Sequence, residues 1–343
     1  MRFEKYISLS LMLLFFSTLA SAKIVFDSIR DGISGIYVMD DDGSNVKLLT
    51  DTHFPLSPSW SPDGKHIVFD RRDEPHNDHR HLFLMNADGS NIHRLTGPSD
   101  AYDDWHASFS PDGGSIIFFR LERKNNKNIP SVRLMNLESG KIKKISDLGV
   151  NQPTFSPDGK KIVFSPVVVI GKSGTDIWIM EADGGNPREL LPSPPQHLLV
   201  NRSYPRWSMD GRKLLYIESQ YKRVEIDGDV DFIPQGFYYY IYDFTSRQSR
   251  RLNIPKDYRG GGIDWTDNDK SVVFSAVKIK LKEPLPRQHL VPYNTYKYHI
   301  ASAKITRLTE HPGSDGAFDW ISDDVLPVSA VDKKKVTWGM LKQ

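Results

Sequence analysis

The sequence predicts an all-β protein, a six-bladed β-propeller of four-stranded antiparallel blades, in which N- and C-terminal strands share one blade. The first observation behind this prediction is the phrase at residues 59–69, SWSPDGKHIVF. It reads as strand, tight turn and strand, because Pro62 fixes φ, Asp63 can bond the turn backbone and Gly64 tolerates positive φ. The phrase returns about every 50 residues, a period typical of propeller blades. Its copies lie at residues 109–113, 155–159 and 207–211, with a degraded copy at 265–269.

A second phrase alternates with the first and supplies the two outer strands of each blade. In residues 36–50 it consists of an apolar strand, an Asp-Gly hairpin and a short strand that ends in Leu-Leu-Thr. Six copies are recognisable, and they start near residues 36, 82, 132, 177, 238 and 296. Each repeat therefore has four strands, named A to D from the channel outward. A closed ring of such sheets buries both faces of every blade.

The chain ends predict how the ring closes. Residues 23–27 form a B-type strand with no A strand before it, and the C-terminal region supplies an A-type strand without C and D strands. That last strand falls either at residues 319–320 or at residues 325–329. Residues 336–341 also look like a strand, which either adds to the closing blade or displaces residues 24–26.

The N-terminal 22 residues are expected to be a signal peptide that is not part of the fold. Arg2 and Lys5 precede a short apolar run, and Ala20-Ser21-Ala22 is a small-residue cleavage site. We expect cleavage after Ala22, one propeller domain over residues 23–343, and a periplasmic or secreted protein. The alternative is an uncleaved membrane anchor, and no other stretch could span a bilayer.

The composition limits the classes of partner and of site that the protein can have. A formal charge of +2 in 343 residues gives no basic field for nucleic acid. The absence of cysteine excludes disulfides, thiol nucleophiles and Cys-based metal sites. We expect a monomer without a cofactor.

The two phrases together resemble the repeats of the TolB-like six-bladed propeller family. The resemblance rests on Trp-Ser-Pro-Asp-Gly-Lys at residues 60–65 and on phrases such as residues 82–96, and it covers nearly all of residues 23–343. It implies the fold, whereas one fold hosts many functions. TolB itself carries an α/β domain before the propeller, and here the repeats are expected to follow the signal peptide directly, so a full TolB role does not follow.

Strand direction places the long, dissimilar loops on one face. The A–B and C–D turns are short and repetitive, whereas the B–C and D–A loops vary and emerge on the opposite face. We therefore expect binding at this loop face, around the mouth of the central channel, with the alternative that aromatic residues only fill the channel top. The candidate binding residues are Tyr102, Asp104, Trp105, His106, Arg202, Tyr204, Tyr258, Arg259, Asp319 and Trp320.

Two insertions in adjacent blades add opposite charge to the loop face. Residues 218–237 carry Glu225, Asp227, Asp229 and Asp231, and residues 276–295 carry Lys278, Lys280, Lys282 and Arg287. The insertions either pair with each other or contact a partner.

Metal and catalytic signals are weak. His76, His79 and His81 lie near acidic residues in one loop, and His106 follows in the next, but a loop fixes no metal geometry. We expect no metal site, and the Gly-x-Ser-x-Gly nucleophile motif is absent.

The sequence thus favours a non-catalytic, extracytoplasmic binding protein that uses the loop face for a protein or peptide partner, although catalysis stays open. One alternative is a carbohydrate-active lyase, because some propeller lyases resemble TolB repeats and use His and a divalent metal. His76, His79, His106 and Arg202 would then be the candidates. Another alternative is a glycan-binding module on the same face.

Overall fold

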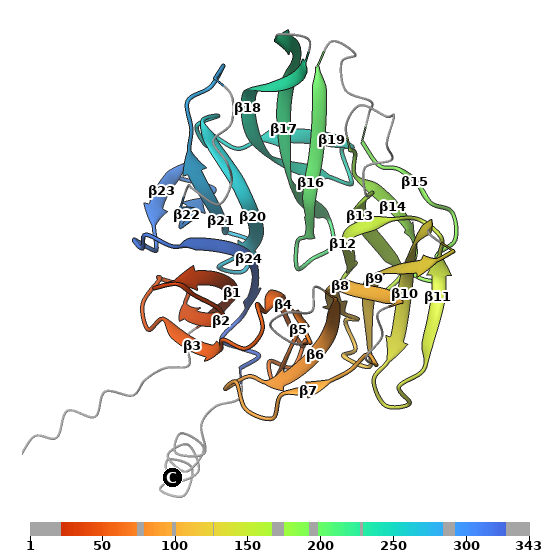
Figure 1. The fold of residues 1–343 in the computed structure, drawn as a ribbon. Coiled ribbons are helices and arrows are strands. Elements are labelled where there is room, and N and C mark those ends of the chain that lie inside the picture. The colour runs from red at the N-terminus through yellow and green to blue at the C-terminus, as the bar shows by residue number, and fades with distance from the viewer. Residues whose placement is uncertain are drawn as a thin grey trace, which may run out of the picture.

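The computed structural model describes residues 22–73, 79–97, 101–125, 127–166, 175–191, 198–226, 229–283 and 292–326. Within these residues the regular structure is entirely β, and it forms six four-stranded antiparallel sheets arranged around a central channel (Figure 1). The predicted fold class is therefore confirmed. The described part of the chain contains no helix long and apolar enough to cross a membrane.

The first strand of each sheet lies nearest the channel and the fourth lies at the rim (Figure 1). Blade 1 consists of β24 (Ser314–Ile321), β1 (Lys23–Arg30), β2 (Ile33–Asp40) and β3 (Lys47–Thr50). Blade 2 consists of β4 (Leu56–Trp60), β5 (His66–Arg72), β6 (Arg80–Asn86) and β7 (His93–Arg94). Blade 3 consists of β8 (Tyr102–Phe109), β9 (Ser115–Lys124), β10 (Lys127–Asn136) and β11 (Ile142–Ser146).

The second half of the ring repeats this order. Blade 4 consists of β12 (Val150–Phe155), β13 (Lys161–Pro166), β14 (Trp178–Glu181) and β15 (Arg188–Glu189). Blade 5 consists of β16 (Leu199–Trp207), β17 (Lys213–Ile226), β18 (Asp229–Asp243) and β19 (Gln248–Arg251). Blade 6 consists of β20 (Tyr258–Thr266), β21 (Ser271–Lys278), β22 (Asn294–His299) and β23 (Lys304–Arg307).

Blade 1 closes the ring as the chain ends predicted. The C-terminal strand β24 pairs antiparallel with β1, with Lys23 opposite Ile321 and Ile24 opposite Trp320. Of the two places expected for this strand, the structure selects the one that contains Asp319 and Trp320. The expectation for residues 336–341 lies outside the described residues.

The Ser-Pro-Asp-Gly phrase forms the predicted turn. In the first copy the Ser61 hydroxyl donates to Asp63 Oδ1 at 2.6 Å, and the Gly64 N–H donates to the Ser61 carbonyl at 2.9 Å. The hydroxyl also accepts the His66 N–H at 2.9 Å, so one serine satisfies both ends of the turn. Gly64 has φ of 66°, the left-handed conformation that its place in the motif requires.

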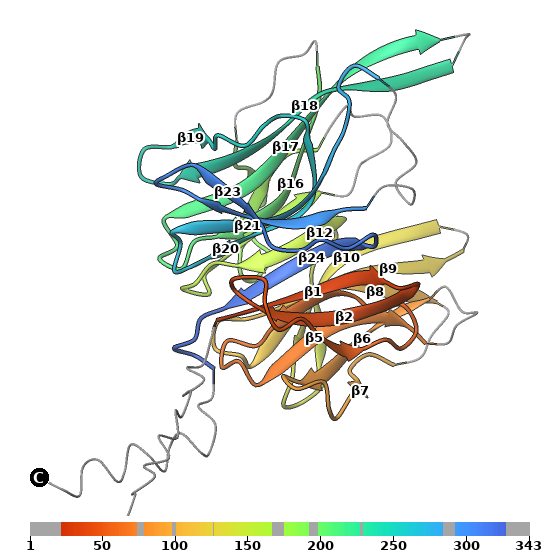
Figure 2. The ribbon, with the colours of Figure 1, turned by 90° about the vertical axis from the view of Figure 1, so that its left-hand side faces the viewer.

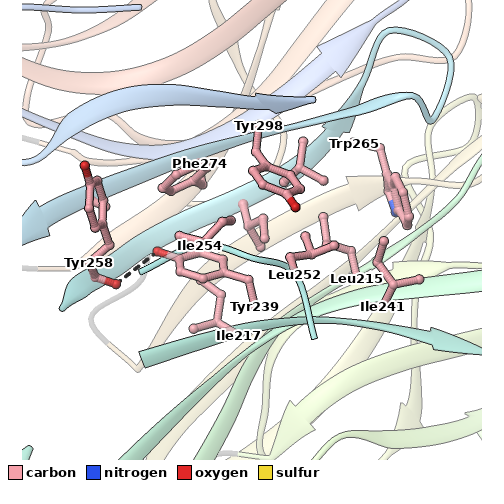
Figure 3. Packing of buried hydrophobic residues seen from close by; sticks show 13 residues of the cluster. Leu215, Ile217, Tyr239, Ile241, Leu252, Ile254, Tyr258, Trp265, Phe274 and Tyr298 are labelled. Carbon is pink, nitrogen blue, oxygen red and sulfur yellow. Dashed lines mark hydrogen bonds between the residues drawn. The ribbon is translucent and has the colours of Figure 1, made fainter. Parts of the chain in front are cut away.

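Apolar side chains between neighbouring sheets form the core. The cluster in Figure 3 joins Ile217 and Tyr239 of blade 5 to Trp265 and Phe274 of blade 6, and the Tyr239 hydroxyl donates to the Tyr258 carbonyl at 3.3 Å. Equivalent clusters lie between the other blades. The ring is thus held by packing between sheets, as the buried B strands predicted.

The A-strand aromatic residues show how tightly each blade packs. Trp60 and Trp265 are buried, with 7% and 4% of their surface exposed. The other three pack partly exposed against inter-blade clusters, and they are Phe109, Phe155 and Trp207.

The glycines of the C–D turns explain the repeated Asp-Gly. A Cβ at Gly89 would lie 2.7 Å from the Leu49 carbonyl oxygen, and one at Gly184 would lie 1.9 Å from the Ile145 carbonyl oxygen. Both glycines also have positive φ. These two C–D turns therefore pack against the outer strand of the preceding blade at a distance that only glycine allows.

Replacing Trp60 with alanine tests the inter-blade packing. We expect Trp60→Ala to lower the free energy of unfolding by about 3–5 kcal/mol, because it leaves a cavity between blades. Urea denaturation measures the change. Met209→Ala, at a side chain that is 54% exposed, is the control and should change stability by less than about 0.5 kcal/mol. Equal stability of both variants would show that the packing role of Trp60 is wrong.

Candidate functional site

The inner strands turn a regular set of side chains toward the channel. The residue before each A-strand aromatic occupies this position, and the set is Ser59, Ser108, Thr154, Arg206, Asp264 and Asp319. Five of them, all but Asp264, line a cavity of about 200 Å³ in the channel together with His106 and Gln152. A space of this size holds a few waters or one small polar group.

A β-bulge in every inner strand shapes this lining. The register of β4, β8, β12 and β16 shifts next to a residue with positive φ, and those residues are Ser57, His106, Gln152 and Tyr204. Such a bulge re-aims side chains and bends the strand. The strand interruption thus brings polar residues into the channel at one level of the ring.

Asp264 and Asp319 form a carboxyl pair that links three blades. Asp264 Oδ2 accepts the Trp320 N–H at 3.1 Å, and Asp319 Oδ2 accepts the Trp60 N–H at 2.5 Å and the Ser59 hydroxyl at 2.8 Å. Burial raises the pKa of Asp264 well above its usual range, and the negative Asp319 raises it further. Burial also raises the pKa of Asp319, whereas the hydrogen bond between the two side chains raises the pKa of Asp264 and acts to lower that of Asp319, so Asp264 is the more readily protonated carboxyl of the pair.

His106 and Arg206 face the same cavity. Burial, together with the nearby Arg206 and Arg80, lowers the pKa of His106 to about 4, so the imidazole is neutral at pH 7. Its Nδ1 atom has no hydrogen-bond partner among the described residues. The Arg206 guanidinium donates to the Pro205 carbonyl at 3.1 Å. The cavity therefore combines a cation, a neutral imidazole and the buried carboxyl group of Asp319.

Tyr204 packs against the cluster between blades 5 and 6, within hydrogen-bond reach of Gln152 in the cavity lining. Its hydroxyl is bonded to Gln152, and the charges of Asp27, Arg206 and Arg259 all act on it, so residues of several blades surround it. Burial raises the pKa of Tyr204, which keeps the hydroxyl neutral.

A groove of about 300 Å³ opens at the mouth of the channel on the loop face. It is lined by Phe54, Arg72, Arg80, Tyr293 and by the backbone of Gly261 and Gly316 among others. The groove and the inner cavity follow each other along β4, since Leu56 lines the groove and Ser57 lines the cavity.

Two of the predicted binding residues form ion pairs inside the blades. Asp104 is fully buried and accepts two hydrogen bonds from Arg120, at 2.6 and 2.7 Å. Arg202 donates to Glu218 at 2.9 Å and to Asp176 at 3.0 Å. Because a fork-shaped guanidinium satisfies these carboxylates, both pairs hold strands together.

Four predicted aromatic residues pack against the protein itself. Trp105 stacks on Phe119 with ring centroids 5.4 Å apart. Tyr102 lies under the Arg120 guanidinium, 3.8 Å from its ring centroid. The remaining two, Tyr258 and Trp320, join the inter-blade clusters. Of the ten candidates, the structure thus brings His106, Tyr204, Arg259 and Asp319 to the channel, and it places the others in the blade packing.

The histidines do not converge on a metal site in the described part of the chain. His79 Nδ1 lies 3.1 Å from Asp103, and His81 is buried with Nε2 3.3 Å from Asp73. No group of three or more potential metal ligands occurs in the described ranges. His76 lies outside the described residues.

The first insertion continues the blade as strands. Residues 218–237 extend β17 and β18 into one long hairpin, in which Glu225 pairs with Val230 in the ladder. The second insertion meets it through a backbone hydrogen bond from the Lys282 N–H to the Pro234 carbonyl at 3.1 Å. Asp227 and Arg287 lie outside the described residues.

The sequence did not lead to Asp264 as a candidate site residue, and it did not distinguish Arg206 from the other residues of its loop. The available signal was the position directly before each A-strand aromatic, which faces the channel in every blade. A polar residue at that position has no place in the inter-blade core, so the charged ones at 206, 264 and 319 could have been grouped in advance.

The carboxyl pair gives a pH-dependent contribution to stability. Because the folded pKa of Asp264 exceeds the unfolded value of about 4, its contribution is complete below about pH 4 and is lost as pH rises through the folded pKa. Asp264→Asn keeps a donor toward Asp319 and does not titrate. We expect wild-type stability to fall relative to this variant by up to about 1.4 kcal/mol per pH unit above pH 4, as measured by urea denaturation. The exposed Asp51→Asn variant should follow the wild type, and parallel curves for Asp264→Asn would contradict the raised pKa of Asp264.

The Asp104–Arg120 pair gives a stability prediction. Asp104→Ala should lower the free energy of unfolding by about 3–5 kcal/mol, because it leaves a buried guanidinium without its carboxylate. The double variant Asp104→Ala/Arg120→Met should recover much of this loss in urea denaturation. A single variant as stable as the wild type would show that the pair has no structural role.

Comparison with known proteins relates the repeats to one propeller family. Residues 17–167 match the family model described as TolB beta propeller domain. An uncharacterized protein of Agrobacterium fabrum is 29% identical over 153 residues, which cover 41% of this chain and 50% of that protein. Dipeptidyl-peptidase 5 of Porphyromonas gingivalis is 25% identical over 141 residues, which cover 38% of this chain and 20% of the peptidase. The chain therefore spans about half the length of the first relative and a fifth of the second.

Solved structures share the fold over most of the chain. TolB from Acinetobacter baumannii superposes with a TM-score of 0.65 at 17% identity, over 88% of this chain and 67% of TolB. An oligogalacturonate lyase in complex with manganese superposes with a TM-score of 0.55 at 14% identity, over 83% of this chain and 73% of the lyase. At such identities the likeness concerns the fold alone. The chain is therefore a six-bladed β-propeller, and its residues 17–167 match the TolB propeller family.

Proposed function

We propose that this propeller is a non-catalytic, extracytoplasmic binding protein whose loop face binds a protein or peptide partner. The loop face is the side of the ring that carries the B–C hairpins and the D–A loops. The single observation that carries the proposal is the set of large apolar side chains exposed there.

Five exposed apolar residues lie on the loop face. Ile29 and Ile33 flank the first B–C hairpin, and Phe54 lies in the D–A loop that borders the mouth groove. Ile129 and Phe232 lie in the hairpins of blades 3 and 5. Ile29, Phe54 and Phe232 have 51%, 47% and 42% of their surface exposed. Apolar side chains that surround a polar opening are typical of protein-binding surfaces.

The hairpin of β17 and β18 extends this face. It projects beyond the ring at the upper right of Figure 2, and the shorter hairpin of β9 and β10 points the same way. The projecting part pairs Arg223 with Phe232 and Val224 with Asp231. It thus offers apolar and charged side chains together, and among the described residues no third strand pairs with 222–226 or 229–233.

An extracytoplasmic location agrees with the resemblance to TolB and with the signal-peptide pattern of the sequence. The lyase alternative has less support. Two of its four candidates, Arg202 and His79, are bonded to carboxylates within the blades, and His106 lies near the Arg206 cation, which disfavours a divalent metal there. A glycan partner would use the same face and is separated from a protein partner by experiment.

The test is affinity capture from envelope extract of the native host by immobilised wild type and two double variants. Ile29→Ser/Phe232→Ser removes apolar surface from the loop face. Val46→Ser/Met209→Ser removes exposed apolar side chains elsewhere and is the matched control. We expect one protein, identified by mass spectrometry, to be retained by the wild type and the control and reduced about tenfold or more with the loop-face variant.

Equal capture by both variants would place the interface elsewhere. Failure of the wild type to retain any protein would overturn the protein-partner proposal, and a glycan array with the same three proteins would then test the glycan alternative.

A further inference from the structure

A groove of about 810 Å³ lies between blades 4 and 5, which are neighbours in the ring (Figure 1). Ligand pockets usually have volumes of about 300–1,000 Å³. Residues 156–158 and 210–211 of two A–B turns line the groove, together with Phe244 and Arg247 of the C–D turn of blade 5. Because A–B and C–D turns emerge opposite the loop face, on what we call the turn face, this groove is a separate site that goes beyond the proposed function.

Aromatic and aliphatic side chains form the apolar part of the lining. Trp207 and Phe244 stack with ring centroids 4.9 Å apart, and Tyr242 meets Phe244 edge-on at 5.1 Å. Ile179 and Leu190 of blade 4 line the same groove. All five belong to one inter-blade cluster, in which Trp207 and Phe244 are only half-buried. The cluster holds the rings in place, so their apolar surface is available to a ligand without rearrangement.

The C–D turn of blade 5 explains why the groove is open. In blades 1, 2 and 4 this turn ends in a glycine, at residues 43, 89 and 184, and a Cβ there would lie 2.7 Å or less from a backbone oxygen of the preceding blade. In blade 5 the turn is one residue longer, and the Arg247 N–H donates to the Asp243 carbonyl at 2.8 Å. Arg247 has the positive φ, 58°, that glycine has in those turns. An arginine cannot make the close contact that the glycines make, so the space between blades 4 and 5 stays open.

The charged residues that line the groove balance one another. Three are cationic and three are acidic, and they are Lys161, Arg188, Arg247, Asp158, Glu189 and Asp210. Their formal charges cancel. The lining therefore has no excess of either sign that would select an anionic or a cationic ligand.

Several of these charged groups have hydrogen-bonding capacity to spare. Arg188, Glu189 and Arg247 are exposed and form no ion pair with the described residues. Asp158 and Asp210 use Oδ1 within their own turns, where each accepts a serine hydroxyl and a backbone N–H at 2.6 to 3.1 Å. Their Oδ2 atoms accept no hydrogen bond from the described part of the chain. The groove thus offers both donors and acceptors around an apolar wall.

A sugar matches this combination. Each sugar hydroxyl donates one hydrogen bond and accepts others, so it can bond to an arginine and to a carboxylate at the same time. The C–H face of a sugar ring packs against aromatic side chains. We propose that the groove between blades 4 and 5 binds a neutral saccharide, with Trp207 and Phe244 against the sugar ring and the surrounding charged side chains bonded to its hydroxyl groups.

Other ligand classes fit the groove less well. A phosphate or a nucleotide brings negative charge that the balanced lining does not neutralise. An extended peptide would pair with a strand edge, and the outer strand here, β15, is only two residues long.

Glycan binding by the purified protein tests the inference. An array that carries neutral and acidic oligosaccharides identifies a ligand, with maltohexaose, cellohexaose and chitohexaose as the neutral probes, and isothermal titration calorimetry measures its affinity. Phe244→Ala removes an aromatic ring from the groove. Leu137→Ala is the matched control, because Leu137 directly follows the first residue of the C–D turn of blade 3, as Phe244 does in blade 5, and lines the groove between blades 2 and 3.

We expect wild type and Leu137→Ala to bind a neutral oligosaccharide alike and Phe244→Ala to bind it about tenfold or more weakly. Arg247→Gly serves if Phe244→Ala does not fold, because glycine adopts the positive φ of this position without strain. It removes one donor and should also weaken binding, whereas Arg250→Gln, an exposed cation on β19 outside the groove, should not.

The loop-face variant Ile29→Ser/Phe232→Ser separates this site from the proposed function. It should bind the oligosaccharide as tightly as the wild type does, and loss of binding in this variant would assign the sugar to the loop face instead. Three other results would overturn the inference. They are no oligosaccharide binding by wild type, binding that Phe244→Ala and Arg247→Gly leave unchanged, and tighter binding of acidic than of neutral oligosaccharides. None of them depends on capture of a partner protein.

Discussion

Pairing of β24 with β1 is the contact on which the rest of the ring depends. Each blade buries its two faces against its neighbours, so an open ring would expose two apolar sheet faces to water. The antiparallel ladder from Lys23 and Ile321 to Ile29 and Ser314 removes that exposure by joining the first and last parts of the fold. It also fixes the position of Asp319, which bonds to Ser59 and Trp60 in the next blade.

Closure around one axis divides the inner-strand positions into two classes. Residues that point between the blades, such as Trp60, must be apolar, because they fill the space between sheets. Residues that point to the axis touch few apolar neighbours, and their side chains are free to vary in polarity. The bulges at His106 and Tyr204 add further polar side chains to those at the axis-facing positions. The channel therefore accommodates charged groups such as Arg206, in addition to the ion pairs that Asp104 and Arg202 form within the blades.

The sequence was sufficient for those features that neighbouring residues determine. The turn at residues 61–66 is bonded within itself, and the Asp-Gly hairpins follow from local conformation, so the number of blades and the origin of the closing strand were predictable. Side-chain partners were not predictable to the same degree. Asp104 was expected at a binding face and instead bonds to Arg120, because cross-strand register decides which side chains meet.

The contact between Asp264 and Asp319 could not be predicted either, because these residues are far apart in the sequence. Asp264 and Asp319 come together only when the two ends of the chain share a blade, and no local pattern contains that information. The long hairpin of blade 5 was expected as a loop insertion, but its strands continue past a bulge at Gln220 and Tyr221. The number of charged residues alone does not show whether such an insertion is a solvated loop or a two-stranded hairpin.

The closing blade also determines how the ring would respond to mechanical force. Lys23 begins β1 directly opposite Ile321, where β24 ends, so the start of one strand and the end of the other lie side by side. In an antiparallel ladder, a pull that separates these two strand ends loads the hydrogen bonds one after another instead of all together. The Lys23–Ile321 end of blade 1 would open first. The same pairing that stabilises the closed propeller therefore makes this end of blade 1 mechanically weak.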